Sequence, residues 1–519
     1  MRHILSIIIV VFCMLLVPCT NAYATYDPLS VPNNKFGIHI ADPNDLAEAA
    51  QLVNSTGGDW GYVVMVIQDN DRSTDKWQSI FNQLRRLHLI PIIRIATHPE
   101  GDSWKIPTPE DASRWADFLN SLLWPTKNRY VVFFNEPNHG KEWGNRIDPE
   151  GYADIFSSYA KEFREYSSDF FILPAGLDFS AQSDGLALNA SEYLERIVAK
   201  YPDFFSAIDG WTSHSYPNPG FSGSPYAIGR GSIASFVWEI SFAQSLGLSK
   251  PLPVFITETG WIHDQGKTYI PSYLSPTQVG INLQTAARST WNDARIAAVV
   301  PFLFNYQDMP FDHFSFKTIG NTGYYDHAQY YTSIQKTEGK PRQNESLVPD
   351  SLPLIPDKLV ADTISLLDAK LKNTGQSIID PFDGYSISFT EESGLLSASP
   401  DSVPYLEPGQ TGTFSLTVKT PKTEGSYPIT LSVVHDGVPV YTEKTRIVVV
   451  PPPSITVSLS PGWKQNKALP RVKCIVYDSN EKIVYEAFGS VRDDGKATFS
   501  DVAHVIPEKS YRVVIVAPY

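Results

Sequence analysis

Strand-like and helix-like segments alternate regularly along residues 35–306 of the 519-residue chain, and this alternation limits the fold most strongly. Several of the helix-like segments open with Asp or Ser followed by Pro, a pattern typical of helix N-termini. The segments expected to be strands are 35–40, 62–67, 90–96, 130–136, 170–176, 208–216, 253–259 and 299–306. Eight β-then-α units in this length predict an α/β protein with a closed parallel (β/α)8 barrel.

The pattern changes after residue 344, where the expected barrel domain (25–344) ends. Residues 345–356 are rich in Pro and predict a linker. Residues 357–450 alternate apolar and polar side chains without a long helix, which predicts an Ig-like β-sandwich. The PPPS run at 451–454 marks a further boundary, and 451–519 resembles the small transthyretin-like β-domains that are appended to secreted enzymes.

The first 24 residues have the pattern of a signal peptide. Arg2 supplies the positive charge, 4–17 is mostly apolar, and Ala22-Tyr23-Ala24 offers a small-x-small cleavage site. An uncleaved anchor is the alternative, but the apolar run is shorter than the ~20 residues that span a bilayer. We expect cleavage near Ala24, a secreted or cell-envelope protein without a transmembrane segment, and no intrachain disulfide, because only Cys474 remains.

The charge balance indicates the kind of partner. Lys and Arg number 42 against 56 Asp and Glu, and the net charge of -14 disfavours nucleic acid and anionic membranes. A neutral partner fits better. The sequence contains no HExxH motif, no G-x-S-x-G elbow and no glycine-rich phosphate loop in the required context, so neither a metal nor a cofactor is expected.

Two of the expected strands end in a glutamate. The run VVFFNEPNHG (131–140) closes the fourth strand with Glu136, and VFITETGW (254–261) closes the seventh with Glu258. In a (β/α)8 barrel the ends of several strands meet at one mouth, so both carboxylates are expected in one cavity. One such glutamate alone could be a surface residue of a loop. The pair is what predicts an active site.

The NEP tripeptide after the fourth strand and the TETGW glutamate of the seventh resemble the signature of clan A glycoside hydrolases, which are retaining barrel enzymes that include cellulase-like and β-xylosidase-like families. The resemblance covers residues 35–338. It implies that Glu136 is the general acid/base, that Asn135 holds the sugar 2-hydroxyl and that Glu258 is the nucleophile. Glycosidic bond cleavage with retention does require two such carboxyl groups.

Three further residues are expected near this pair. His214 and Tyr216 lie two apart on the sixth strand and so share a face. The resemblance implies that Tyr216 hydrogen-bonds the nucleophile and that His214 contacts sugar, whereas packing alone is the alternative. Arg94 interrupts an apolar strand, and a buried guanidinium needs an anion. Glu258 is the expected partner, with another ion pair in the barrel wall as the alternative.

Aromatic residues in strand-end loops are candidates for stacking on sugar rings. Trp143 follows Glu136 and Trp261 follows Glu258, although both could be core residues. Many clan A families place a tryptophan at the end of the eighth strand, where this chain offers Phe304 or Tyr306.

The sequence therefore predicts a secreted retaining β-glycoside hydrolase that acts on a polysaccharide, oligosaccharide or glycoconjugate. The alternative is an inactive carbohydrate-binding or cell-surface interaction protein with the same barrel. The C-terminal β-domains are expected to be dispensable for the chemistry and to act as a spacer, as a stabiliser or in contact with cell wall or glycan.

Overall fold

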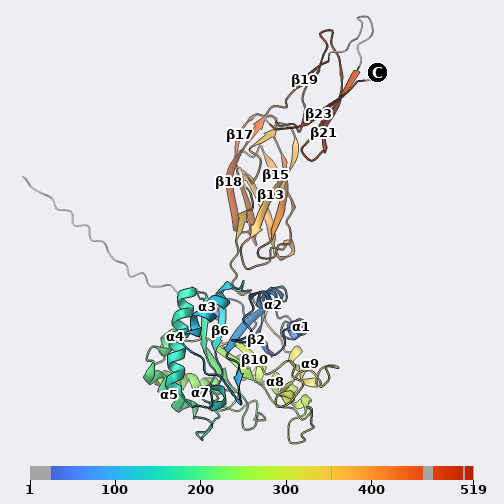
Figure 1. Ribbon diagram of the computed structural model, residues 1–519. Helices are drawn as coiled ribbons and strands as arrows, with labels where there is room; N and C mark the ends of the chain where they lie inside the picture. Colours follow the sequence, from blue (N-terminus) through green and yellow to red (C-terminus); the bar gives the residue numbers. More distant parts are fainter. Residues whose placement is uncertain (1–24, 352–353, 460–470, 507–508, 518–519) are drawn as a thin grey trace, which may run out of the picture. The chain divides into compact units, whose positions relative to one another are not determined.

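The computed structural model describes residues 25–351, 354–459, 471–506 and 509–517 (Figure 1). These fall into two compact units, Met1–Arg342 and Gln343–Tyr519. The expected signal peptide, residues 1–24, lies outside the described residues. Of the helices that are described, none combines the length and apolar character needed to cross a membrane.

The N-terminal unit is built on parallel strands in two sheets. The first sheet has the order β1-β2-β3-β6-β7 and the second the order β10-β9-β8, and all pairings within them are parallel. The strands are β1 (Gly37–Ile40), β2 (Gly61–Gln68), β3 (Leu89–Ala96), β6 (Arg129–Phe133), β7 (Phe170–Pro174), β8 (Trp211–His214), β9 (Val254–Thr259) and β10 (Ile296–Pro301).

Backbone hydrogen bonds also link the two sheets at both edges. Next to β1, Phe36 forms a parallel bridge with Val299 of β10, and the Val299 amide donates to the Lys35 carbonyl at 2.7 Å. On the other side, the amide of Asp209, just before β8, donates to the Ile172 carbonyl of β7 at 2.9 Å. The strands therefore follow one another in chain order around the unit.

Helices lie outside these strands and cover them (Figure 1). Apolar side chains of the strands form an inner cluster that includes Tyr62, Ile92, Val132 and Phe255, and a larger outer cluster packs the helices onto the strands. The helices are α1 (Leu46–Val53), α2 (Thr74–Arg86), α3 (Asp111–Ser121), α4 (Pro149–Tyr166), α5 (Ala190–Lys200), α6 (Phe204–Ala207), α7 (Ser235–Ser245), α8 (Pro276–Arg288) and α9 (Asp326–Thr332).

All eight expected strands are present, but their bounds differ from the expected ones, and the largest differences are in the fourth, sixth and eighth. The fourth stops at Phe133 and the sixth at His214, before the residues NEP and SYP. The eighth runs over 296–301 rather than 299–306. It begins earlier because Ile296–Ala298 pairs with β9, and it ends at Pro301, which has no amide hydrogen to donate.

The C-terminal unit contains two four-stranded sheets that share a buried core, with orders β11-β13-β16-β15 and β12-β18-β17-β14, and a smaller region with β19-β22 and β21-β20-β23. Its strands are β11 (Leu347–Pro349), β12 (Lys358–Val360), β13 (Ile364–Asn373), β14 (Tyr385–Glu391), β15 (Ser397–Ser402), β16 (Thr411–Lys419), β17 (Gly425–His435), β18 (Val438–Val450), β19 (Ile455–Ser458), β20 (Arg471–Tyr477), β21 (Ile483–Ser490), β22 (Lys496–Phe499) and β23 (Arg512–Val516).

The segment expected to be a linker differs most from the sequence interpretation. Within 345–356, Leu347–Pro349 forms β11 and pairs antiparallel with β13, and Leu347 is buried. An apolar side chain that can enter a core outweighs the local proline content, and Pro349 is tolerated at a strand end. The boundary between the compact units therefore falls at Arg342, and the two β-regions expected on either side of residue 451 belong to one unit.

Candidate active site

Arg94, His214 and Glu258 reach the site from strands β3, β8 and β9. Along β3, Ile90 and Ile92 face the inner cluster, and Arg94 continues the same face because side chains alternate along a strand. His214 and Glu258 are partners in the β8–β9 pairing, which places the two side chains next to each other.

Glu136 is positioned by an irregular loop. After β6 ends at Phe133, Phe134 and Glu136 adopt φ values of 71° and 29°, a conformation that costs a non-glycine residue about 1 kcal/mol. Backbone hydrogen bonds hold the loop, since the Glu136 amide donates to the Gly176 carbonyl at 3.1 Å and the His139 amide donates to the Glu136 carbonyl at 2.8 Å.

The two glutamates meet at one histidine. His214 Nδ1 lies 2.7 Å from Glu136 Oε1 and 3.8 Å from Glu258 Oε2, so these two carboxylate oxygens are at most 6.5 Å apart. The side chain of His214 is almost fully buried, whereas 21% of Glu136 and 11% of Glu258 is exposed. The carboxylates can therefore reach a molecule from solvent, while the histidine stays beneath them.

Glu258 is held as a carboxylate by several groups. Arg94 Nη1 donates to Oε1 at 2.9 Å, and the Tyr216 hydroxyl donates to Oε2 at 3.1 Å. Burial alone raises the pKa of Glu258, but the charges of His214 and Arg94 outweigh burial and lower it. For His214, burial lowers the pKa, but the charge of Glu258 and the hydrogen bond with Glu136 outweigh burial and raise it to about 9.

Asn135 accepts a hydrogen bond from Arg94 Nη1 through its side-chain carbonyl oxygen. Nearby, burial raises the pKa of Glu142 to about 7, and the charge of Arg94 opposes this rise. Glu142 ends a 3-10 turn, η3 (Gly140–Glu142), in the same loop as Glu136. Sequence analysis did not identify Glu142; its position six residues after Glu136 was the available signal.

His39, on β1, is a second residue that sequence analysis missed. It is 4% exposed, and neither ring nitrogen has a hydrogen-bond partner among the residues that the structure describes. Burial lowers its pKa to about 3, with the charge of Glu258 acting in the opposite direction. The imidazole is therefore neutral, and both of its nitrogens are shielded from solvent. Its place in an expected strand was the only sequence signal.

The structure does not support stacking roles for the two tryptophans. Trp143 is fully buried and packs on Phe134, with ring centroids 5.8 Å apart. Trp261 is 2% exposed, and its indole donates to the Gly223 carbonyl at 2.8 Å. Both are core residues because the loops after the strands fold back onto the strands and helices, which leaves no ring face for a sugar.

At the eighth strand, the aromatic residues differ in their accessibility. Phe304 is fully buried beneath Lys317, so of the two expected residues only the partly exposed Tyr306 can line the site. Tyr306 contacts Phe311, which contacts Phe302 at 5.2 Å, and Phe302 meets the His39 ring at 5.1 Å. An aromatic surface therefore connects the eighth strand to the carboxylates.

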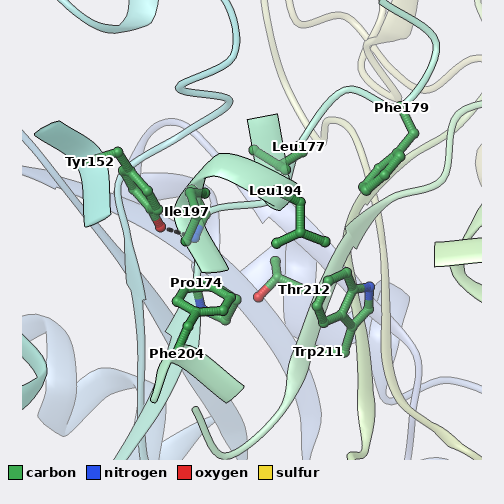
Figure 2. A pocket seen from close by; sticks show the side chains of 10 residues that line it. Tyr152, Pro174, Leu177, Phe179, Leu194, Ile197, Phe204, Trp211 and Thr212 are labelled. Carbon is green, nitrogen blue, oxygen red and sulfur yellow. Dashed lines mark hydrogen bonds between the residues drawn. The ribbon is translucent and has the colours of Figure 1, made fainter. Parts of the chain in front are cut away.

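A small, mostly apolar cavity lies elsewhere in the N-terminal unit, between β7, β8 and helices α4 and α5 (Figure 2). Figure 2 shows Leu177, Leu194 and Phe204 around it, with the polar groups of Tyr152 and Thr212 at its margin. It contains none of the site residues and has no candidate catalytic pair. The described part of the chain also holds no group of three metal-ligating side chains.

No protein-family model matches this chain, and no curated protein matches it. Among solved structures, it is similar to a family 39 glycoside hydrolase from Bacteroides cellulosilyticus WH2 (11% identity over 76% of this chain and 82% of that one, TM-score 0.39). It is also similar to β-glucuronidase 2 of Bacteroides uniformis, with 10% identity over 94% of this chain and 64% of that one and a TM-score of 0.40. A third similar structure is an endo-β-1,4-glucanase of Xanthomonas axonopodis pv. citri, with 12% identity over 58% of this chain and 99% of that one and a TM-score of 0.39.

These three names belong to the class of enzyme that the NEP and TETGW motifs resemble. At identities of 10–12% and TM-scores of 0.40 or less, however, the likenesses decide neither fold nor activity. The contacts of the two glutamates are the stronger basis for a function.

Proposed function

We propose that the N-terminal unit is a closed (β/α)8 barrel that works as a retaining β-glycoside hydrolase. The observation that carries this proposal is that Glu136 and Glu258 approach the same nitrogen of His214 and are at most 6.5 Å apart, the sum of their distances of 2.7 and 3.8 Å to it. Carboxyl groups of retaining enzymes are ~5–5.5 Å apart, whereas inverting enzymes leave ~6.5–9.5 Å for a water molecule.

The contacts of the two glutamates assign their roles. Glu258 is the nucleophile, because Arg94 and Tyr216 orient its oxygens and its lowered pKa keeps it ionised. In the first step a Glu258 oxygen bonds to the anomeric carbon as the glycosidic C–O bond breaks, and Glu136 gives its proton to the leaving oxygen. In the second step Glu136 takes a proton from water, whose oxygen replaces Glu258 on the anomeric carbon.

The surroundings favour an uncharged sugar. His39 adds no charge to the site, because burial lowers its pKa to about 3 and leaves the imidazole neutral. The two nearest cations, Arg94 and His214, are already paired with the glutamates, so they offer little to a sugar carboxylate. Tyr306 and Phe311 supply an aromatic surface for a sugar ring.

We also propose that the protein is exported by residues 1–24 and that the C-terminal β-strands contact cell wall or glycan. The proposed reaction depends neither on export nor on this contact. The net charge of -14 fits a neutral glycan better than a polyanion.

The test is an assay of the purified protein on β-linked glycans and aryl β-glycosides, beside a Glu136→Gln, Glu258→Gln double variant. We expect turnover by the wild type and none by the double variant, with the anomeric configuration retained in the first product by NMR. Sugar binding without turnover, equal in the two proteins, would instead identify an inactive carbohydrate-binding barrel.

A further inference from the structure

A groove lies between helices α1 and α9, which contact each other in the N-terminal unit (Figure 1). Its volume is about 420 Å³, within the range of ~300–1,000 Å³ that is usual for small-molecule sites. Most of the side chains that line it are polar or aromatic, among them Glu48, Gln51, Tyr324, Asp326 and Gln329. Neither catalytic glutamate lines it, so this groove is separate from the site described above.

Tyr324 offers the groove an aromatic ring of fixed orientation. Lys317 and Tyr324 form an antiparallel bridge, and the Thr318 amide donates to the Gly323 carbonyl at 3.0 Å, so the backbone turns back on itself here. The Tyr324 hydroxyl donates to the carboxylate of Glu48 on α1. A ring that is held at both its backbone and its hydroxyl loses little conformational entropy when a ligand stacks on it.

Part of this ring remains accessible. Lys317 Nζ lies over the ring, 4.8 Å from its centroid, and also donates to Glu48 at 2.6 Å. With one face covered in this way, 45% of Tyr324 is still exposed. The face away from Lys317 can therefore receive the apolar face of a sugar ring.

Hydrogen-bonding groups that the protein does not use line the same groove. The side-chain amides of Gln51 and Gln329 are exposed and form no hydrogen bond with any described residue. Asp326 uses only Oδ2, which accepts from the Thr277 hydroxyl at 2.7 Å, and Glu48 uses only Oε2. Donors and acceptors beside an aromatic ring match the hydroxyl groups and apolar faces of a sugar.

The charges of the groove favour an uncharged ligand. Its described lining contains no Lys, Arg or His, and the carboxylate of Asp326 would repel an anion. The net charge of -14 acts in the same direction. A cationic ligand gains little, because Glu48 is already paired with Lys317 and the same ammonium group occupies one face of the Tyr324 ring.

We propose that this groove is a second carbohydrate-binding site, which takes an uncharged glycan chain with one sugar ring stacked on Tyr324. The occupant is inferred from the groove's own chemistry, so the proposal goes beyond the proposed reaction and does not require turnover. Glu48 lies in the first turn of α1, which follows β1, and the groove therefore begins at the end of the strands where Glu136 and Glu258 lie. A glycan bound there stays close to the two glutamates.

Hydroxyl-radical footprinting of the full chain tests the groove directly. The oxidation rate of Tyr324 is measured by mass spectrometry with and without hexasaccharides of β-1,3-glucan, β-1,4-glucan or β-1,4-xylan. The Glu136→Gln, Glu258→Gln double variant is used, so that no probe is degraded. At least one probe should lower the rate severalfold at Tyr324 and leave it unchanged at Tyr166, an exposed tyrosine at the end of α4. An unchanged rate at Tyr324 with every probe overturns the proposal.

Substitutions in the same background separate the ring from its hydroxyl. In calorimetric titrations with the protecting hexasaccharide, Tyr324→Ala should weaken one binding step by about 10-fold, as expected for the loss of one stacking contact. Tyr324→Phe keeps the ring and should leave every step unchanged. Tyr166→Ala is the matched control, because it also removes an exposed tyrosine whose hydroxyl lies 3.1 Å from a side-chain oxygen, that of Ser113. Equal affinities of Tyr324→Ala and its parent contradict the proposal.

Kinetics keep this proposal apart from the proposed function. With the reaction site intact, Tyr324→Ala and the wild type should have the same kcat/KM on a small aryl β-glycoside, because the groove lies outside that site. A loss on this small substrate would place Tyr324 in the reaction site and overturn the proposal of a second one. If the wild type turns over no glycoside, the proposed function fails, and footprinting and calorimetry still decide whether the groove binds glycan.

Discussion

At the scale of single residues, the site depends on one buried cation between two acids. His214 contacts Glu136 at 2.7 Å and Glu258 at 3.8 Å, and the charge of Glu258 and the hydrogen bond with Glu136 outweigh burial to bring the pKa of His214 to about 9. The histidine therefore carries a positive charge at neutral pH. This charge reduces the repulsion between the two carboxylates.

Replacing either glutamate should produce a different kinetic signature. Glu258→Ala should lose turnover on all substrates by a factor of about 10⁴ or more, because no covalent intermediate forms. Glu136→Ala should lose activity mainly on poor leaving groups, since a good one leaves without a proton. Initial rates over a series of aryl glycosides measure the difference. Azide should rescue Glu258→Ala to an inverted product and Glu136→Ala to a retained one; the opposite pattern would exchange the two roles.

The His214 charge also predicts a pH dependence. Since this charge lowers the pKa of Glu258, His214→Asn should raise that pKa and move the acid limb of kcat/KM to higher pH by about one unit. His435→Asn is the control, because His435 also lies 2.7 Å from a glutamate, Glu345, but belongs to the C-terminal unit. An acid limb that stays in place in His214→Asn contradicts the assignment of Glu258 as the group that must be ionised.

At the scale of elements, the site is supported by close contacts behind β8. Glu239 of α7 is fully buried and accepts hydrogen bonds from the Trp211 indole and the Ser213 hydroxyl, both at 2.9 Å, so it fixes the strand that carries His214. Just beyond β7, Gly176 faces the His214 ring, and a Cβ atom there would lie 2.3 Å from His214 Cδ2. Only glycine leaves room for the ring.

Gly176→Ala should therefore impair catalysis more than stability. The methyl group must displace His214, and a displacement of about 1 Å in a catalytic group can reduce the rate by about 100-fold. Gly185→Ala in the same β7–α5 loop is the control, because a Cβ atom at Gly185 meets nothing within 4 Å. Measurements of kcat and of thermal unfolding for both variants test this. Equal activities would show that the site tolerates movement of His214.

At the scale of the whole molecule, the two compact units have separate hydrophobic cores. Among the described residues, the clusters of the N-terminal unit extend to Ile334, and those of the C-terminal unit begin at Leu347. The glutamates, His214 and Arg94 all belong to the N-terminal unit. We therefore expect Met1–Arg342 to be sufficient for the proposed chemistry.

A chain that ends at Arg342 should fold and keep the activity of the full protein on small soluble substrates. Its thermal midpoint should lie within a few degrees of the corresponding transition of the full chain, because each apolar cluster of the described residues lies within one unit. Calorimetry of both proteins measures this, with kcat/KM on an aryl glycoside as the second readout. Aggregation, or a much lower midpoint, would mean that the β-sheets stabilise the barrel.

Much of the architecture could be predicted from the sequence, because it follows from local patterns. Apolar runs and capping residues define the eight strands, and the strand-end position of Glu258 follows from its apolar run. The contact of Arg94 with Glu258 also agrees with the expectation, because a guanidinium inside an apolar wall needs an anion.

The remaining features depended on tertiary structure, because they arise from residues far apart in the chain. The burial of Trp143 and Trp261 depends on how the loops after β6 and β9 fold back, and β11 forms because Leu347 packs into a core beside β13. His39 and Glu142 join the site only when β1 and the loop beyond β6 meet around Glu258, 219 and 116 residues away in the sequence (258 − 39 and 258 − 142). Sequence patterns place residues on strands, whereas packing decides which of them face one another and which remain accessible to a sugar.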